Sequence, residues 1–163
     1  KVYGASKIFG TAGSEEKCAL ARDLGADIAI NYREEDFEQV VKQAGGADVT
    51  LDMVGGDYVQ KNIGAAKADG RIINIAYQNG MSVTVNFGLV LMKRLSLMAT
   101  TLRARPVAEK SRLRAAVEKD FWPHVASGKI RAVLDTTYPL AEAEKALAHM
   151  EQGGHSGKIL LKV

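Results

Sequence analysis

The hydrophobic positions follow two periods that alternate along the chain. Short apolar runs, bounded by Gly, Ser or Asn, are typical of buried strands. Between them lie longer segments whose apolar side chains recur every three or four positions, as on one face of a helix. The runs predict strands over residues 8–12, 28–31, 47–54, 71–76, 96–102, 132–138 and 158–163.

Helices are predicted between these strands, and signals mark their ends. Ser14 is a good N-cap, and the two glutamates after it favour the positive end of the helix dipole. Gly25 ends this helix, and Asp36 caps the next one. The other predicted helices cover residues 58–70, 88–93, 106–128 with a division at Pro123, and 141–151. A short strand is predicted around Val83 and Val85.

Strands separated by helices of this length require parallel crossover connections. The sequence therefore predicts an α/β fold, a Rossmann-like, doubly wound and mostly parallel sheet formed by one domain over residues 1–163. Residues 1–6 have the pattern of the tail of a helix. We therefore expect a sheet truncated at its N-terminus, without the first strand and the glycine-rich turn of such a domain.

Composition narrows the class of protein. Hydrophobic residues make up 47% of the chain and charged residues 25%, which excludes a disordered or collagen-like protein. No apolar run is long enough to cross a membrane. One cysteine, Cys18, cannot form an internal disulfide, and the scattered His124, His149 and His155 predict no metal site. We expect a reducing, cytoplasmic setting.

The charge of the chain is mildly positive. Lys and Arg number 22 against 19 Asp and Glu, a net charge of +3. This is far from the dense basic stripe of a dedicated nucleic-acid-binding protein, and it suits an anionic small ligand equally well. The basic positions between residues 93 and 114 lack interleaved aromatic residues, so a solvated surface is favoured over nucleic-acid contact.

Ligands of open α/β sheets bind where the strands end. An acidic residue at the end of the first predicted strand would bind the ribose of NAD, but Gly13 and Ser14 stand there. Ser14 could donate to a 2′-phosphate, and Lys17, Tyr32 and Arg33 could complete an anion pocket. Alternatively, Ser14 is only a helix cap, Lys17 a solvated charge and Tyr32 a packing ring.

Other strand ends carry weaker signals. Five of the strand ends lie at residues 13–14, 31–32, 54–56, 76–77 and 100–103, and small residues dominate three of them. Small residues allow a ligand to lie against bare backbone, although glycines also serve tight turns. Asp52 ends the third predicted strand, where its carboxylate could accept backbone N–H groups. The chain has no nucleophile elbow that would indicate a hydrolase.

The chain resembles the quinone oxidoreductase branch of the zinc-free medium-chain dehydrogenases/reductases, of the zeta-crystallin-like, p53-inducible type. The resemblance rests on Thr11–Lys17, Leu24–Asp27, Ile30–Arg33 and Asp52–Gly56, and it continues through residues 69–71, 93–94, 101–105 and 157–158. It implies a two-domain enzyme that reduces quinones or other conjugated carbonyls with NADPH. The GroES-like substrate domain of that family is absent from these residues.

The resemblance also implies cofactor-binding positions. Ser14 and Lys17 match the contacts to the 2′-phosphate, and Tyr32 matches the aromatic residue beside it. Val54 and Gly55 match the segment that passes the adenine-side ribose. No catalytic residue is implied, because hydride transfer in this family depends mainly on placing the nicotinamide against the substrate.

Three further matches concern the nicotinamide end of the cofactor. Ala76 and Tyr77 match the backbone beside the nicotinamide. Leu102 and Arg103 match the loop that closes over it. Lys158 corresponds to a position near the cofactor in some members of the family.

The expected partners are a small substrate and a second copy of the chain. The resembling family dimerises by joining two sheets edge to edge, and a strand at a sheet margin invites such pairing, so we expect a homodimer through Ser82–Thr101. Two alternatives to a quinone oxidoreductase remain. One is a related zinc-free enal or enoyl reductase or alcohol dehydrogenase relative, and the other is a non-catalytic nucleotide- or RNA-binding module.

Overall fold

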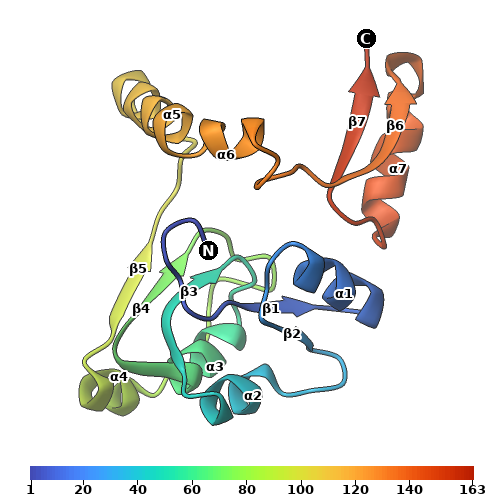
Figure 1. The fold of residues 1–163 in the computed structure, drawn as a ribbon. Coiled ribbons are helices and arrows are strands. Elements are labelled where there is room, and N and C mark those ends of the chain that lie inside the picture. Colours follow the sequence, from blue (N-terminus) through green and yellow to red (C-terminus); the bar gives the residue numbers. More distant parts are fainter. The chain divides into compact units, whose positions relative to one another are not determined.

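The structure is a computed structural model that describes all 163 residues. The chain forms two compact units, Lys1–Ala104 and Arg105–Val163, called unit 1 and unit 2 below (Figure 1). In both units every pair of neighbouring strands is parallel. This confirms the predicted α/β class with parallel strands and helical crossovers.

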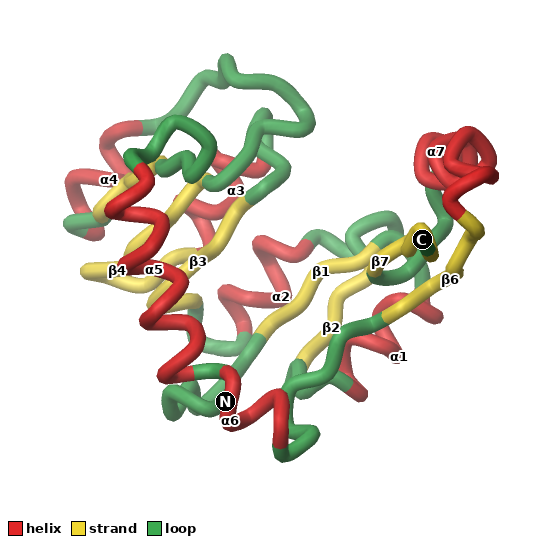
Figure 2. The backbone as a smooth tube through the Cα atoms, turned by 90° about the horizontal axis from the view of Figure 1, so that it is seen from above, coloured by secondary structure: helices red, strands yellow, loops and turns green.

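Unit 1 alternates strands and helices. In chain order these are β1 (Phe9–Ala12), α1 (Glu15–Asp23), β2 (Ile28–Asn31), α2 (Phe37–Gln43), β3 (Ala47–Asp52), α3 (Tyr58–Ala65), β4 (Ala66–Asn74), α4 (Phe87–Lys93) and β5 (Ser96–Ala99). The strands form two sheets, β1-β2 and β3-β4-β5, rather than the single predicted sheet (Figure 2). Strands β1 and β3 are therefore each hydrogen-bonded along one edge only.

Two hydrophobic clusters hold unit 1 together. The first consists of Ile30, Phe37, Val41 and Ala65, and the second of Ile63, Ala66 and Ile72. Helix α3 contributes to both clusters through Ile63 and Ala65. It therefore packs against β2 and α2 on one side and against β4 on the other, which joins the two sheets into one unit.

The predicted helix caps at Ser14 and Asp36 are confirmed. The Ser14 hydroxyl oxygen accepts a hydrogen bond from the N–H of Lys17 at 3.3 Å. The Asp36 carboxylate accepts one from the N–H of Glu38 at 3.2 Å. Both bonds satisfy an N–H group that the first turn of a helix leaves without a partner.

Helix α3 ends earlier than the sequence predicts, because strand β4 already begins at Ala66. The Lys93 ammonium group donates to three carbonyl oxygens at this helix end, those of Ile63 (3.0 Å), Gly64 (2.7 Å) and Ala66 (2.8 Å). Burial lowers the pKa of Lys93. This lysine from α4 thus closes a helix whose own last residues give no stop signal.

Two other local predictions in unit 1 are wrong. Residues 1–7 contain no helix, because Gly4 adopts φ +79° in a turn and the Lys1 ammonium group is held at 2.6 Å by Asp27. Val83 and Val85 belong to no strand. Val85 instead packs against the second hydrophobic cluster, so its side chain contributes to the core and not to a strand at the edge of a sheet.

Unit 2 contains α5 (Val107–Asp120), α6 (Trp122–Ala126), β6 (Leu134–Pro139), a 3₁₀ turn η1 (Leu140–Glu142), α7 (Ala143–Gln152) and β7 (Lys158–Lys162). Strand β6 pairs with β7. The predicted division of the long helix near Pro123 is confirmed, with α6 starting one residue before the proline. None of the helices in the structure has the length and apolarity to span a membrane.

Two histidines that look scattered in the sequence lie together in unit 2. The His149 and His155 rings have centroids 6.1 Å apart, and Nε2 of His149 is 3.7 Å from the Asp135 carboxylate. The N–H of Ser156, which donates to Asp135, is the main cause of a lowered pKa for that carboxyl group. Asp135 lies on β6 and His149 on α7, so the cluster depends on how this helix packs against the strand.

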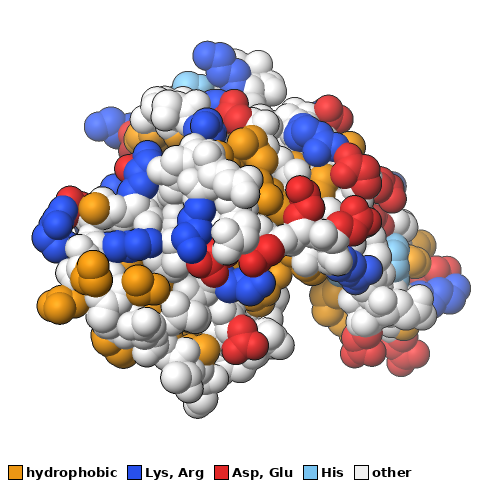
Figure 3. All heavy atoms as spheres, turned by 90° about the horizontal axis from the view of Figure 1, so that it is seen from below, with side chains coloured by type: hydrophobic (Ala, Val, Ile, Leu, Met, Phe, Trp, Pro, Cys, Tyr) orange, Lys and Arg blue, Asp and Glu red, His pale blue; other side chains and the backbone are white.

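Two of the four basic residues of α5, Arg112 and Arg114, are paired within the helix. Arg112 contacts Glu109 at 2.7 Å, and Arg114 contacts Glu118 at 2.7 Å. On the face drawn in Figure 3, Lys and Arg side chains are interspersed with Asp and Glu. These pairings compensate part of the charge that the sequence shows as a basic stretch.

Candidate functional site

The first part of the candidate site lies where β1 and β2 end. A Cβ atom placed on Gly13 would lie 2.6 Å from the Tyr32 hydroxyl oxygen and 3.4 Å from Nε of Arg33. A larger residue at this position would displace the Tyr32 side chain. The structure therefore brings the Tyr32 hydroxyl and the Arg33 guanidinium group to the backbone beside Ser14.

This part of the site begins helix α1, whose first turn carries the carboxylates of Glu15 and Glu16 beside the Lys17 ammonium group. The first turn of a helix presents unpaired N–H groups and the positive end of the helix dipole. Glu15 forms an ion pair with Arg22 farther along α1, so its charge is compensated within the helix. Ser14 and Lys17 lie in the same turn, and no carboxylate ends β1. Hydroxyl, ammonium and guanidinium groups together suit a phosphate.

The second part of the site is a pair of loops that follow β3 and β4. Their backbones are joined by hydrogen bonds from Gly56 N to Gly80 O (3.0 Å), from Gln78 N to Met53 O (3.2 Å) and from Asn79 N to Val54 O (2.7 Å). Gly55 adopts φ +69°, and a Cβ atom on it would lie 2.6 Å from Cδ1 of Tyr77. The predicted residues Val54, Gly55, Ala76 and Tyr77 thus lie together.

The buried carboxylate of Asp52 holds the first of these loops. One of its oxygens accepts the N–H groups of Val54 at 2.7 Å and of Gly55 at 3.2 Å, which confirms the interpretation of Asp52 made from the sequence. The other oxygen accepts a hydrogen bond from the side-chain amide of Asn74 at 2.8 Å. Sequence reasoning missed Asn74, although a polar residue inside the apolar run Ile72–Ile75 was a signal for it.

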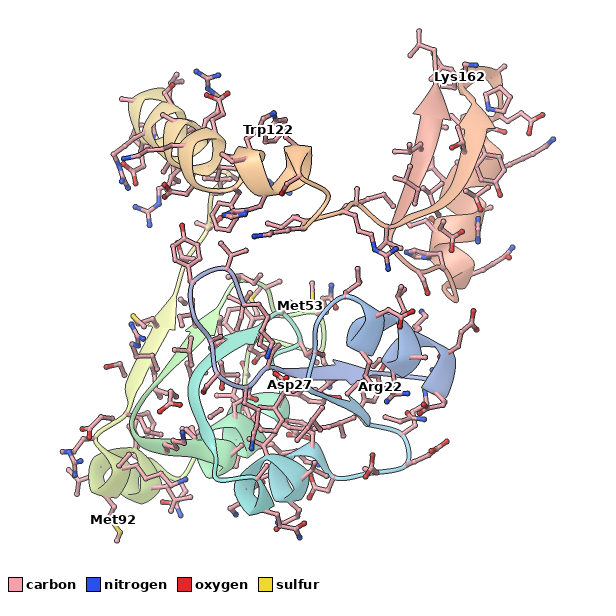
Figure 4. The ribbon with its side chains drawn as sticks, in the orientation of Figure 1. Arg22, Asp27, Met53, Met92, Trp122 and Lys162 are labelled. Atoms are coloured by element: carbon pink, nitrogen blue, oxygen red, sulfur yellow. The ribbon has the colours of Figure 1, made fainter.

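Tyr58 connects the two parts of the site. It is the first residue of α3, directly after the β3 loop, and its ring lies edge-on to the Tyr32 ring with centroids 6.3 Å apart. Burial raises the pKa of Tyr58, and the neighbouring Tyr32 adds a smaller effect in the same direction. The ends of β2 and β3 are therefore held next to each other. Tyr32, Tyr77 and Met53 all remain partly exposed, and Met53 is labelled in Figure 4.

The remaining predicted residues lie on other segments of the chain. Leu102 and Arg103 follow β5 in unit 1, where Leu102 is exposed. Lys158 begins β7 in unit 2, and its backbone N–H donates to Val133 O at 2.9 Å. The structure thus assembles seven of the ten predicted positions into two neighbouring clusters: Ser14, Lys17, Tyr32, Val54, Gly55, Ala76 and Tyr77.

Replacing Gly55 with Ala tests how tightly the two loops fit. The new methyl group would meet Tyr77 and the carbonyl oxygen of Gly80 (2.6 and 2.9 Å) from a left-handed backbone, so we expect a loss of about 1–3 kcal/mol in the free energy of unfolding. Urea unfolding measures it. Gly80→Ala is the matched control, because its φ is also positive (+101°) but its Cβ would meet nothing within 4 Å. Equal losses in both variants would show that the loops are not in close contact.

No group of three or more His, Cys, Asp or Glu side chains is placed to hold a metal ion. Cys18 is buried in α1, and burial is the main cause of a raised pKa for its thiol, which makes it a poor ligand. The donor set of these 163 residues does not fit zinc.

Parallel strands with helical crossovers, a glycine at the first strand end and two interlocked loops at the next two strand ends define a Rossmann-type unit for binding a dinucleotide. The comparisons with known proteins assign the family. The chain belongs to the zinc-binding dehydrogenase family, whose model matches residues 24–161. This confirms the resemblance to the medium-chain dehydrogenases/reductases that the sequence motifs indicate.

Similar proteins are oxidoreductases. Quinone oxidoreductase-like protein 2 of Bos taurus is 31% identical over 166 residues, which cover 97% of this chain and 46% of the bovine protein. The chloroplastic NADPH-dependent alkenal/one oxidoreductase of Arabidopsis thaliana is 28% identical, covering 98% of this chain and 34% of that protein. The chain thus spans about half or less of the length of these relatives.

A solved structure shows the shared fold. The quinone oxidoreductase of Thermus thermophilus, determined alone and in complex with NADPH, superposes with a TM-score of 0.81. The match covers 96% of this chain and 50% of that one at 24% sequence identity. The likeness is therefore one of fold, and it confirms a Rossmann-like α/β architecture for this chain.

Proposed function

We propose that this chain is the cofactor-binding part of an NADPH-dependent oxidoreductase that transfers a hydride to quinones or other conjugated carbonyls. The observation that carries the proposal is the end of β1, where Gly13 and Ser14 replace a ribose-binding carboxylate and the Tyr32 hydroxyl lies against Gly13. A carboxylate at this position would repel a 2′-phosphate, whereas the groups present attract one.

The residues of this chain would hold NADPH from its adenosine end towards its nicotinamide. Ser14, Lys17 and Arg33 would contact the 2′-phosphate, with Tyr32 beside it. The backbone at Val54–Gly55 would pass the adenine-side ribose. The bare backbone of these loops lets a ligand approach closely. Bound NADPH supplies the hydride, and the chain contributes position and charge rather than an acid or base.

The remaining predicted residues would serve the other end of the cofactor. Ala76 and Tyr77 would lie beside the nicotinamide, Leu102 and Arg103 would close over it, and Lys158 would lie near the cofactor. The conjugated acceptor is supported by the names of the relatives, since quinones and alkenals both accept a hydride at a carbon conjugated with a carbonyl group. We also propose that the enzyme is zinc-free and cytoplasmic, because its single cysteine is buried and unpaired.

We propose that the pyrophosphate is bound by a strand and turn outside these 163 residues. Strands β1 and β3 each keep one unpaired edge, and a parallel strand placed between them would complete a single sheet. Such a strand would lead into a helix whose N-terminus can neutralise the pyrophosphate. The substrate domain would also lie outside this chain, as about half of each relative does.

We propose that two copies of the chain pair through the Ser82–Thr101 region. Strand β5 is the last strand of its sheet, and all its residues are exposed. Helix α4, which precedes it, exposes Phe87, Leu91 and Met92, and Met92 projects away from the unit (Figure 4). Exposed apolar side chains beside an unpaired strand edge are typical of an interface.

Binding to the full-length gene product tests the proposed function. We expect NADPH to bind at least about tenfold more tightly than NADH, measured by the fluorescence of the reduced nicotinamide. Equal affinities would contradict the proposal. Hydride transfer to a benzoquinone or to an enal then identifies the acceptor class. Retention of RNA at physiological salt, without any hydride transfer, would favour the nucleic-acid-binding alternative instead.

A further inference from the structure

Two polar side chains are buried side by side at the ends of β3 and β4. Asp52 and Asn74 occupy matching positions of the two strands and are only 4% and 7% exposed. The amide nitrogen of Asn74 donates to the Asp52 carboxylate at 2.8 Å. A buried carboxylate is costly unless it is fully hydrogen-bonded, so the pair needs a reason beyond packing.

The hydrogen bonds of Asp52 reach both loops of the candidate site. Its side chain holds the N–H groups of Val54 and Gly55, and its backbone oxygen accepts the N–H of Ile75 at 2.8 Å. Asn74 is the last residue of β4, directly before the second loop. One buried pair therefore fixes the starting point of each loop and the distance between them.

We propose that Asp52 and Asn74 are positioning residues, which set the Val54–Gly55 and Ala76–Tyr77 segments at the spacing that the cofactor requires. The inference rests on the proposed function, because these segments are its cofactor-binding loops. Both side chains are buried, so they act through the loops and do not touch the cofactor. An apolar pair would fill the same space but would leave the N–H groups of Val54 and Gly55 unbonded.

The hydrogen bond between the two side chains needs a donor at position 74, because the Asp52 carboxylate can only accept. Removing that donor tests the proposal. In Asn74→Asp two carboxylates would face each other across about the same distance, and the charge of one would raise the pKa of the other well above its usual value. At low pH one shared proton would restore a hydrogen bond. At higher pH the two charges would repel and push the loops apart. Tyr58 on α3 is the neighbouring titratable group. Burial is the main cause of its raised pKa and the Asp52 charge adds little, so Tyr58 stays neutral at neutral pH.

The experiment measures NADPH binding by the full-length Asn74→Asp variant between about pH 5.5 and pH 8. We expect its affinity to approach that of the wild type at the low end and to be at least about tenfold weaker at the high end. The KM for NADPH should rise, with a smaller change in kcat. The Val54 and Gly55 amide protons should exchange faster than in the wild type at the higher pH.

The exchanged pair Asp52→Asn with Asn74→Asp provides the rescue. The amide oxygen of the asparagine introduced by Asp52→Asn can accept hydrogen bonds from the N–H groups of Val54 and Gly55. Its NH₂ group can donate to the carboxylate introduced by Asn74→Asp. NADPH affinity should return to within about threefold of the wild type, and the pH dependence should disappear. Asp57→Asn is the matched control, because Asp57 lies in the same loop and makes no side-chain capping bond.

The possible results separate this inference from the proposed function. Failure of the wild type to bind any nicotinamide nucleotide would end the proposed function. Normal wild-type binding together with wild-type affinity of Asn74→Asp across the pH range would overturn only the inference. If Asn74→Asp alone fails to fold, the exchanged pair decides. Restored binding supports the positioning role, and a folded exchanged variant that does not bind NADPH overturns it.

Discussion

Replacing Ser14 with Asp is expected to turn the full-length protein from one that prefers NADPH into one that prefers NADH. The carboxylate would lie beside Gly13, where it can accept hydrogen bonds from ribose hydroxyls and repel a 2′-phosphate. Losing a contact to the charged phosphate costs about 1.5–3 kcal/mol. NADPH affinity should therefore fall roughly ten- to a hundredfold, while NADH affinity rises.

The substitution is conservative for the fold, which keeps the result interpretable. Asp caps helices as well as Ser does, so the bond to the N–H of Lys17 and the start of α1 should persist. Ser14→Asn is the matched control, because asparagine also caps the helix and has the shape of aspartate without its charge. Titration with both reduced cofactors measures the change. A Ser14→Asp variant that still prefers NADPH would place the 2′-phosphate elsewhere in the structure.

Features that depend on neighbouring residues were predictable from the sequence. The caps at Ser14 and Asp36 and the backbone contacts of Asp52 each join a side chain to an N–H group two or three residues away. Such bonds form from local chain geometry, so residue type and spacing suffice to predict them. The division of the long helix near Pro123 follows for the same reason.

Features that depend on distant residues were not predictable in this way. The end of α3 is set by Lys93, which lies 30 positions after Ile63 along the chain. The partner of Asp52 becomes visible only when the register of β3 and β4 is known, since Asn74 is 22 positions away. The contact of His149 with Asp135 likewise needs α7 to pack beside β6. Propensity and periodicity describe one segment at a time, so they do not identify the residue that faces it on another strand.

The candidate site shows both situations. Ser14 and Lys17 share one helical turn, so their proximity follows from the sequence. The approach of the Tyr32 hydroxyl to Gly13 depends on the parallel pairing of β1 with β2, and only the structure shows that a larger residue there would displace the Tyr32 side chain. The family resemblance pointed to Ser14, Lys17 and Tyr32 as one site because the family shares a fold in which these strand ends lie together. Residue patterns within one chain segment do not contain that information.

Blocking the free edge of β5 is expected to dissociate the proposed dimer. The N–H of Thr100 donates to Asn74 O on β4 at 3.0 Å. Because the polar groups of successive strand residues point to opposite edges, the N–H of Met98 also faces β4 and that of Leu97 faces outward. In a two-fold pairing of β5 with its copy, Leu97 would therefore supply a ladder donor to the second chain.

Replacing Leu97 with Pro removes this donor while leaving the bonds between β4 and β5 in place, since proline is tolerated on the open edge of a strand. We expect the dimer to be weakened by about 3 kcal/mol or more, so that a protein dimeric at tens of micromolar sediments as a monomer. Leu97→Thr is the control, because it loses the same apolar side chain but keeps the N–H group, and it should remain dimeric. A monomeric wild type, or a Leu97→Pro variant that sediments as an unchanged dimer, would rule out pairing through this edge.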